Sequence, residues 1–428
     1  MWNPHIIRES MDCKIPADIT VSDKERELLK GLAARVREIS ELPIMEERRH
    51  LWRKHNDLDN ERPMLLADPE GAWMELIPDN ELECESQLLR WWEITLKKSI
   101  FNYENIGDDD VVEPWFDIPW DVTIGEYGVH VTKIYGDDRG SYTWKHPLNN
   151  LDEDLGKLKY RDLQVDRELT RKKLGLAQDI FGDLLPARIH GKYWWSVGMT
   201  ADIVHLVGLE DFMLYMYDDP DGVHRLMKWF RDEHLHFINW FEQEGLLQDS
   251  HENEYVGSGG IAFTSELPRR GDSAGAVKLS DIWGHSESQE TVGVSPDMFA
   301  EFIFPYQKPI IEKFGLACYG CCEAIDQRMA TVLEVDNIRR LSVSPWADEA
   351  KCAELLGRNY VYSRKPNPAP ICVGFDETAV RESLEKTLTT AKGCNLEFNM
   401  KDTHTLQNDR TRPGRWVKIA RELIDKHS

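Results

Sequence analysis

The chain has 428 residues, of which 41% are hydrophobic and 30% charged, and its formal net charge is −24. This composition is sufficient for a large core and argues against global disorder. The strong negative charge argues against a surface for nucleic acid or for an anionic membrane.

The N-terminal stretch, residues 1–20, carries scattered charges and lacks the apolar core of a signal peptide. No apolar run in the sequence approaches the roughly 20 residues that a membrane-spanning helix needs. We therefore expect a cytoplasmic protein. Its eight cysteines would then remain reduced and serve metal binding, thiol chemistry or packing.

Residues 1–61 are predicted to form an N-terminal helical extension. Ser22 can cap a first helix, in which Leu28, Leu32 and Val36 share one face. The following charged stretch continues with the same helical pattern.

Residues 62–428 are predicted to form one domain in which short apolar or β-branched runs alternate with helices. The candidate strands are 63–68, 111–118, 187–197, 254–263, 316–322, 339–346, 359–366 and 395–402. A well-marked helix follows Asp219, with Pro220 in its first turn and Gly245 at its end. Eight strands that alternate with helices predict a (β/α)8 TIM barrel, and an open doubly wound sheet is the alternative. The segments 125–160 and 264–294 are expected to be long insertions.

The chemistry of such a barrel lies at the carboxyl ends of its strands. This rule selects Asp68, Asp117, the region 190–195, Glu266, residues 321–323, Trp346, Lys365 and residues 401–404.

Three of these candidates end the predicted fifth strand: Cys321, Cys322 and Glu323. Neighbouring residues of a regular strand point to opposite sides, so the two cysteines cannot both face the barrel axis. A thiolate and a carboxylate here could belong to a zinc site that is completed from other strands. The alternative is that the cysteines only pack in a buried strand.

A second polar group, Lys401, Asp402 and His404, ends the predicted eighth strand. A cation, an acid and an imidazole at a barrel mouth could bind a substrate carboxylate, ligate a metal or move a proton. The alternative is a solvated loop that carries ordinary charges.

Two further candidates lie elsewhere along the chain. Asp117 lies between Phe116 and Ile118, so its carboxylate is expected to be either desolvated or paired with a cation, unless it only bonds a loop backbone. His285 is predicted to lie in the long loop after the fourth strand, where it could reach over the mouth or be incidental. The glycine-rich stretch 257–262 matches a dinucleotide motif only loosely, because no clear helix follows it.

Residues from about 62 to the C-terminus resemble the uroporphyrinogen decarboxylase superfamily, whose fold is a (β/α)8 barrel. The superfamily also contains zinc- and corrinoid-dependent methyltransferases. The resemblance is carried by the stretches 206–227, 295–315, 341–357 and 360–371.

On this pattern, Asp117 in "WFDI" matches the essential aspartate of the decarboxylase. Asp402 in "FNMKD" matches a position that is histidine in the decarboxylase and cysteine in the methyltransferases. In "YGCCE", Cys321 matches the zinc-binding cysteine, but Tyr319 stands where a histidine is expected. The missing ligand could be supplied by Cys322, Glu323, Asp402 or His404. The arginine-rich motif of the decarboxylase is absent after the first strand.

The resemblance implies an enzyme that moves a methyl group between a small-molecule substrate and a corrinoid carried by a partner protein, assisted by zinc. The expected catalytic residues are Asp117, His285, Glu323 and Lys401, and the expected metal ligands are Cys321, Cys322, Asp402 and His404. The alternatives are a cofactor-independent decarboxylase or lyase, in which Lys401 holds a carboxylate and Asp117 handles protons, and a non-catalytic ligand-binding barrel. A homodimer is compatible with each of these hypotheses.

Overall fold

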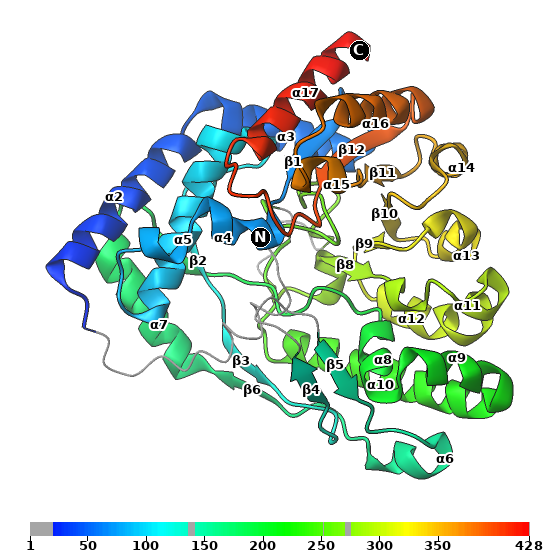
Figure 1. Ribbon diagram of the computed structural model, residues 1–428. Coiled ribbons are helices and arrows are strands. Elements are labelled where there is room, and N and C mark those ends of the chain that lie inside the picture. Colours follow the sequence, from blue (N-terminus) through cyan, green and yellow to red (C-terminus); the bar gives the residue numbers. More distant parts are fainter. Residues whose placement is uncertain (1–19, 136–141, 251, 270–274, 428) are drawn as a thin grey trace.

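The N-terminal helices and the body of the molecule are seen in a computed structural model, which describes residues 20–135, 142–250, 252–269 and 275–427 (Figure 1). Helix α2 (Asp23–Ser40) begins with the predicted cap, since the Ser22 hydroxyl accepts the backbone N–H of Glu25. It is followed by α3 (Pro43–Asn56) and, after the first strand, by α5 (Gln87–Phe101). The helices predicted for the described part of the N-terminal extension are confirmed as α2 and α3, while residues 1–19 of that extension lie outside the described residues.

A parallel sheet of six strands forms the centre of the described structure, in the order β1-β12-β11-β10-β9-β8. Its strands are β1 (Met64–Ala67), β8 (Trp283–Ser286), β9 (Leu316–Tyr319), β10 (Ile338–Val343), β11 (Val361–Arg364) and β12 (Asn395–Met400). Two more strands, β2 (Phe116–Ile118) and β7 (Ala187–Ile189), pair with each other in parallel. The chain is thus an α/β protein with the alternation expected of a barrel, while closure of the barrel stays a prediction.

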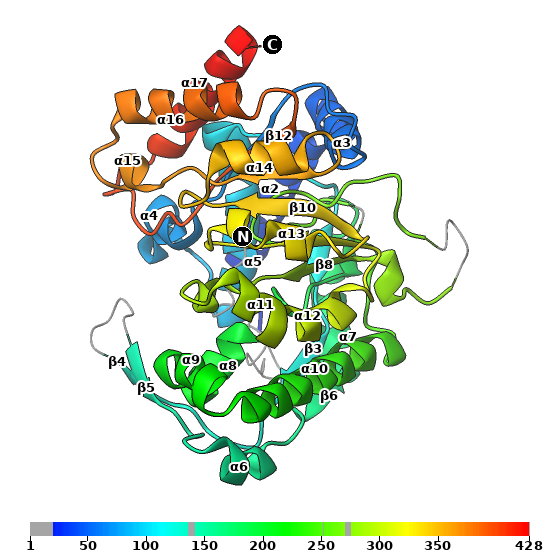
Figure 2. The same ribbon diagram turned by 90° about the vertical axis from the view of Figure 1, so that its right-hand side faces the viewer.

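Helices surround these strands on the outside (Figures 1 and 2). The longer ones are α7 (Arg167–Phe181), α8 (Thr200–Val207), α9 (Leu209–Asp218), α10 (Pro220–Gln243), α11 (Pro296–Phe302), α12 (Phe304–Ile311), α14 (Glu349–Leu356), α16 (Glu377–Thr390) and α17 (Arg412–His427). Helix α10 has the predicted cap, because the Asp219 carboxylate accepts the backbone N–H of Gly222. Among the described helices, none is both long and apolar enough to cross a membrane.

Short helices and two antiparallel ribbons complete the described elements. The short helices are α4 (Trp73–Leu76), α6 (Leu151–Asp154), α13 (Met329–Val332) and α15 (Ala369–Cys372). The ribbons pair β3 (Asp121–Ile124) with β6 (Leu163–Asp166), and β4 (Thr132–Tyr135) with β5 (Tyr142–Lys145). The second ribbon and α6 lie within the predicted insertion 125–160.

The prediction of a strand at 254–263 is wrong, and the fourth parallel strand along the chain is β8 instead. Residues 254–263 turn back on themselves, with one antiparallel bridge between Tyr255 and Ile261. Gly257 and Gly260 have φ of +65° and +104°, a backbone conformation that side chains other than glycine rarely adopt. The apolar run predicted a strand, but the glycines make it a turn.

The two faces of the sheet differ in polarity, because successive side chains of a strand alternate. One face carries the apolar side chains of the largest hydrophobic cluster, Leu341, Val343, Tyr362, Leu396 and Phe398. The other face carries buried polar side chains, Arg340, Ser342, Ser363, Glu397 and Asn399. The 254–263 turn lies against this polar face, since the Ser258 hydroxyl contacts that of Ser342 at 3.1 Å.

Helix α3 covers the amino end of the sheet. His55 Nε2 lies 3.0 Å from a carboxylate oxygen of Glu397, and both side chains are fully buried. The Arg340 guanidinium donates to Asn56 Oδ1 at 2.6 Å, and Asn56 Nδ2 donates to the backbone oxygen of Ile261 at 2.8 Å. Helix α3 is therefore bonded to the buried polar side chains at the amino end of the sheet. The division into residues 1–61 and 62–428 stays a prediction.

Candidate functional site

The two adjacent thiols lie together just after β9. The strand ends at Tyr319, and Gly320 has a φ of +93°, so the alternation of a regular strand no longer applies to the next residues. The sulfur atoms of Cys321 and Cys322 lie 3.6 Å apart. The neighbouring Cys322 thiol and burial raise the pKa of Cys321 well above its usual value, so this side chain stays a thiol at neutral pH.

Tyr319 does not point toward the thiol pair. Its hydroxyl lies 2.7 Å from Gln307 Oε1 and 3.2 Å from Ser288 Oγ, on the apolar side of the sheet. The residue at the position of the expected histidine therefore takes no part in the group around Cys321.

Glu323 fastens the segments that follow β8 and β9. Its buried carboxylate accepts the backbone N–H groups of Ser288 at 3.0 Å and Cys321 at 2.7 Å. Burial raises the pKa of this carboxyl group. Its geometry is that of a residue that positions the thiol turn, while the catalytic role expected for it stays a prediction.

Lys401, at the end of β12, is held in a polar group with Glu70 and Tyr255. Its ammonium nitrogen lies 2.8 Å from Glu70 Oε1 and donates to the Tyr255 hydroxyl at 3.4 Å. Burial by itself would lower the pKa of Lys401, but Tyr255 and Glu70 outweigh it and raise this pKa well above its usual value. The side chain is therefore a fixed positive charge.

Asp402 connects this charge to the thiols. Its backbone N–H donates to Glu70 Oε2 at 2.7 Å, and its φ of +57° turns the chain out of the strand. One carboxylate oxygen of Asp402 lies 3.9 Å from the Cys322 sulfur. The two strand ends that the sequence singled out, β9 and β12, therefore meet in one group.

His404 lies apart from that group. Its side chain is exposed and lies against Gly71, where an added Cβ would be 3.4 Å from His404 Nδ1. Over the described ranges, no group of three or more His, Cys, Asp and Glu side chains is arranged to hold a metal ion. The predicted ligands therefore do not form a three-ligand zinc site as they are placed, and zinc binding stays a prediction.

His285 lies in strand β8 and not in a loop, which corrects the expectation from the sequence. The ring is 2% exposed, with Nδ1 3.1 Å from the Trp195 carbonyl and Nε2 3.2 Å from the Gly320 carbonyl. Burial, with the nearby Lys192 and Lys365, lowers the pKa of His285 to about 3. The neutral ring has one N–H and therefore donates to only one of these two carbonyl oxygens.

Asp117 belongs to a separate ion-pair group between β2 and β7. Its carboxylate accepts Arg188 Nε at 2.6 Å, and Arg188 also donates to Glu252 at 2.7 Å. These side chains line a cavity of about 180 Å³. His190, which also lines it, lies 2.6 Å from Glu254. The expectation of a paired carboxylate is met, but no contact joins Asp117 to Lys401 in the part of the chain that the structure describes.

Glu266 does not lie at the carboxyl end of a strand, because residues 254–263 form a turn. Its carboxylate pairs with Arg339 at 2.6 Å, and Arg339 lies at the start of β10. The residue therefore lies at the amino end of the sheet.

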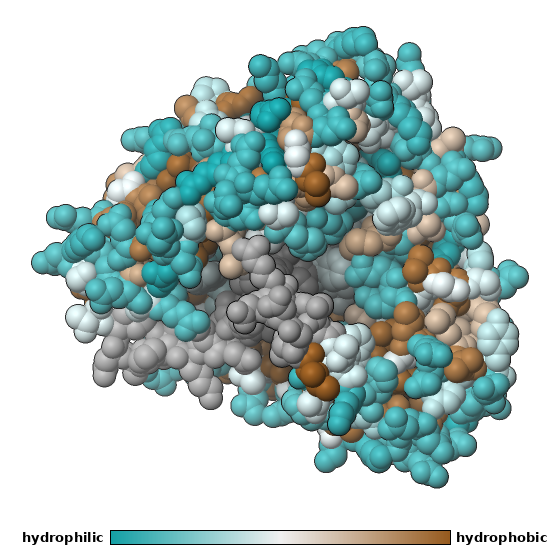
Figure 3. Space-filling view, viewed as in Figure 1, coloured by the Kyte–Doolittle hydropathy of each residue, from teal (hydrophilic) through white to brown (hydrophobic). Residues whose placement is uncertain are grey.

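Apolar side chains are exposed on the segments that follow four of the parallel strands. They are Met74 after β1, Val292 after β8, Trp346 after β10 and Val373 after β11, with exposed fractions of 76%, 60%, 74% and 68%. Because the strands are parallel, these segments leave the sheet at the same end as those that carry the thiols and Lys401. We call these four residues the apolar rim. Apolar patches also interrupt the mostly hydrophilic face in Figure 3.

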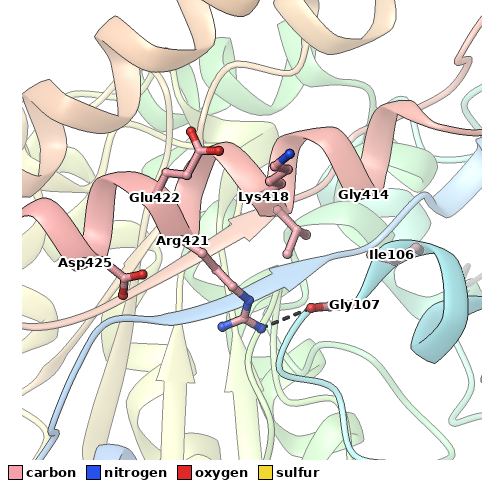
Figure 4. A pocket seen from close by; sticks show the side chains of 8 residues that line it. Ile106, Gly107, Gly414, Lys418, Arg421, Glu422 and Asp425 are labelled. Carbon is pink, nitrogen blue, oxygen red and sulfur yellow. Dashed lines mark hydrogen bonds between the residues drawn. The ribbon is translucent and has the colours of Figure 1, made fainter.

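Another hollow, of about 330 Å³, lies between α17 and the segment before β2 (Figure 4). Arg421 crosses it and donates to the Gly107 carbonyl at 3.1 Å and to Asp109 at 2.9 Å. Asp109 also binds Arg62, which precedes β1. The hollow thus belongs to the amino end of the sheet, and none of the predicted site residues lines it.

A methyltransferase of known structure is among the proteins to which this chain is similar. No family model matches the sequence, and no curated protein matches it. The structure is similar to a methyltransferase from Methanosarcina mazei, with 12% sequence identity and a TM-score of 0.46, over 88% of this chain and 97% of that chain. The function is therefore argued from the residues of this chain.

Proposed function

We propose that this chain is an enzyme that transfers a methyl group between a small-molecule substrate in the mouth and a corrinoid carried by a partner protein. The observation that carries the proposal is that the exposed apolar rim and the buried polar group follow the same ends of parallel strands. The carrier protein would dock at this end of the sheet. Exposed apolar side chains rimmed by polar ones are typical of such docking surfaces.

The polar group inside the rim supplies the chemistry of the proposed transfer. A corrinoid contributes a cobalt centre that exchanges a methyl group. Negative charge develops on the substrate heteroatom when it loses its methyl group, and the fixed charge of Lys401 can stabilise it. Glu70 and Tyr255 hold the Lys401 ammonium in place through the contacts described above. No step of this proposal uses a metal bound by the chain.

A methyl-transfer assay with free cob(I)alamin tests the proposal. The full chain is incubated with O-methyl, N-methyl and S-methyl compounds, and formation of methylcob(III)alamin is followed by its absorption spectrum. We expect turnover with one of these classes. Lys401→Met should lower kcat/KM by about 10²–10³-fold, because a preorganised charge at the reacting centre is lost.

Lys386→Met is the matched control, since that lysine lies on the outer helix α16 with a largely exposed side chain. It should leave the rate unchanged. Failure of the folded chain to methylate cob(I)alamin from every class, or full activity of Lys401→Met, would sink the proposal.

A further inference from the structure

Two lysines that follow parallel strands, Lys365 after β11 and Lys192 after β7, form no ion pair with a carboxylate among the described residues. The Lys365 ammonium, 2% exposed, donates to the Ser363 hydroxyl at 3.3 Å. The Lys192 ammonium donates to the Tyr255 carbonyl oxygen at 2.9 Å. Within the described residues, neither nitrogen has a carboxylate oxygen within 4.0 Å, whereas Lys401 has Glu70 at 2.8 Å.

The two ammonium groups approach the end of β9 from different strands. Lys365 follows β11 and Lys192 follows β7, and both act on His285, which lies on β8 beside β9. Lys192 donates to the carbonyl oxygen of Tyr255, and the hydroxyl of the same residue accepts from Lys401 at 3.4 Å. Lys401 follows β12, which is paired with the strand that Lys365 follows. The two charges therefore serve one region of the mouth and not two separate surfaces.

The hydrogen-bond partners of both ammonium groups are neutral. An ammonium group has three N–H donors, and a hydroxyl or a carbonyl oxygen satisfies only one of them without removing the charge. Burial lowers the pKa of both lysines and outweighs the more distant carboxylates of Glu254 and Glu397, which favour their charged forms. An unpaired buried cation lowers the stability of a protein unless a ligand supplies the missing charge.

We propose that Lys192 and Lys365 form an anion-binding subsite that holds an oxyanion group, a carboxylate or a phosphate, of the small substrate. The inference rests on the proposed function only in placing a substrate in the mouth, and it names the chemical class of that substrate. Lys401, which already has Glu70, remains available for the reacting atom. In this proposal Lys192 and Lys365 bind the substrate, and Lys401 acts on the atom that loses the methyl group.

Thermal unfolding of the full chain with added anions tests the subsite. Inorganic phosphate and acetate are the two probes, at constant ionic strength with chloride. We expect one of them to raise the Tm of the wild-type protein in a saturable way, because a ligand that binds only the folded state stabilises it. The probe with the larger effect distinguishes a phosphate from a carboxylate group.

Lys365→Met should raise the Tm without anions and weaken the response to them. A buried cation without a counterion is removed, and the apolar side chain has a similar volume. The affinity for the effective anion should fall about tenfold or more, as for a lost hydrogen bond to a charged group. Lys392→Met, at an exposed lysine, is the matched control and should retain the full response.

Several results would overturn the subsite. They are the absence of a Tm response to both anions, an unchanged response in Lys365→Met, and a lowered Tm of this variant together with a retained response. If Lys365→Met does not fold, Lys192→Met is measured in the same way, and a retained response there has the same meaning. Methyl transfer without any anion response contradicts the subsite alone, whereas an anion response without methyl transfer contradicts the proposed function alone.

Discussion

At the scale of single residues, Glu287 lies in surroundings that oppose its charge. Its side chain is 1% exposed, and the Ser196 hydroxyl contacts one carboxylate oxygen at 3.2 Å. Burial, followed by the nearby Glu290 and Glu323, raises the pKa of Glu287 well above its usual value. The folded chain therefore keeps a proton on this carboxyl group where the unfolded chain has lost it.

The substitution Glu287→Gln should remove a loss of stability that grows with pH. The unfolded carboxyl group titrates near 4.3, and the folded one titrates higher. Between the two values the folded state binds more protons, so the free energy of unfolding falls as pH rises, by about 1.4 kcal/mol per pH unit from this group. Urea unfolding at pH 5 and pH 8 should show a larger gain for the variant at pH 8.

Glu301→Gln, at an exposed position of α11, is the control for this comparison and should follow the pH dependence of the wild type. An identical pH dependence in Glu287→Gln and the wild type would show that Glu287 is ionised in the folded state.

Part of the candidate site could be predicted from residue positions alone. Cys321, Cys322, Lys401 and Asp402 each follow a recognisable strand, and parallel strands bring such residues to one end of a sheet. Tyr255 could not be predicted as their neighbour. Residues 254–263 have the composition of a strand, and only the structure shows that they form a turn against the polar face of the sheet.

At the scale of elements, the glycine turn of 254–263 depends on the absence of side chains. A Cβ on Gly260 would lie 2.5 Å from the guanidinium carbon of Arg340, which is fully buried. Arg340 also pairs with Glu397 at 3.1 Å. The turn and the polar face of the sheet therefore fit each other only with glycine at this position.

Gly260→Ala should lower the free energy of unfolding by about 2–4 kcal/mol, because it adds a steric clash to a backbone with a φ of +104°. The measurement is the urea midpoint followed by circular dichroism. Gly31→Ala, in α2 with nothing within 4 Å of the added Cβ, is the control and should stabilise by about 0.5–1 kcal/mol. Equal midpoints for Gly260→Ala and the wild type would show that the packing of the turn against Arg340 does not require glycine at this position.

The remaining strands could be predicted where their residues are apolar or β-branched, and not where polar residues and glycine interrupt the run. Apolar runs such as 316–322 and 395–402 marked β9 and β12, and a cap at Asp219 marked α10. Strand β8 was not predicted, because "WGHS" contains glycine and two polar residues. Its side chains are nevertheless all buried, since Gly284 lies against Phe314, and only the assembled sheet provides that environment.

At the scale of the whole molecule, the two ends of the sheet have different tasks. The amino end is covered by α3, whose Asn56 binds Ile261, Phe263 and Arg340. The carboxyl end holds the thiols, the lysines and the apolar rim. The N-terminal helices therefore serve stability, and the rest of the chain can present a polar mouth.

Asn56→Ala should lower the free energy of unfolding by about 2–4 kcal/mol, because it leaves several buried hydrogen-bonding groups without a partner. Chemical unfolding of the full chain measures this loss. Asn359→Ala, at an exposed position, should change the stability by less than about 0.5 kcal/mol. A loss at Asn56 no larger than that at Asn359 would show that α3 only rests on the sheet.

The turn at 254–263 also has a consequence for the order in which the chain folds. Ser258 contacts residues 62 and 84 positions later in the sequence, Gly320 and Ser342, and Ile261 is bound by Asn56, 205 positions earlier. The turn therefore contacts residues from both the N-terminal and the C-terminal half of the chain. Contacts of such long range form slowly. We infer that insertion of this turn is a late event in folding, and that no half of the chain can complete its polar interior alone.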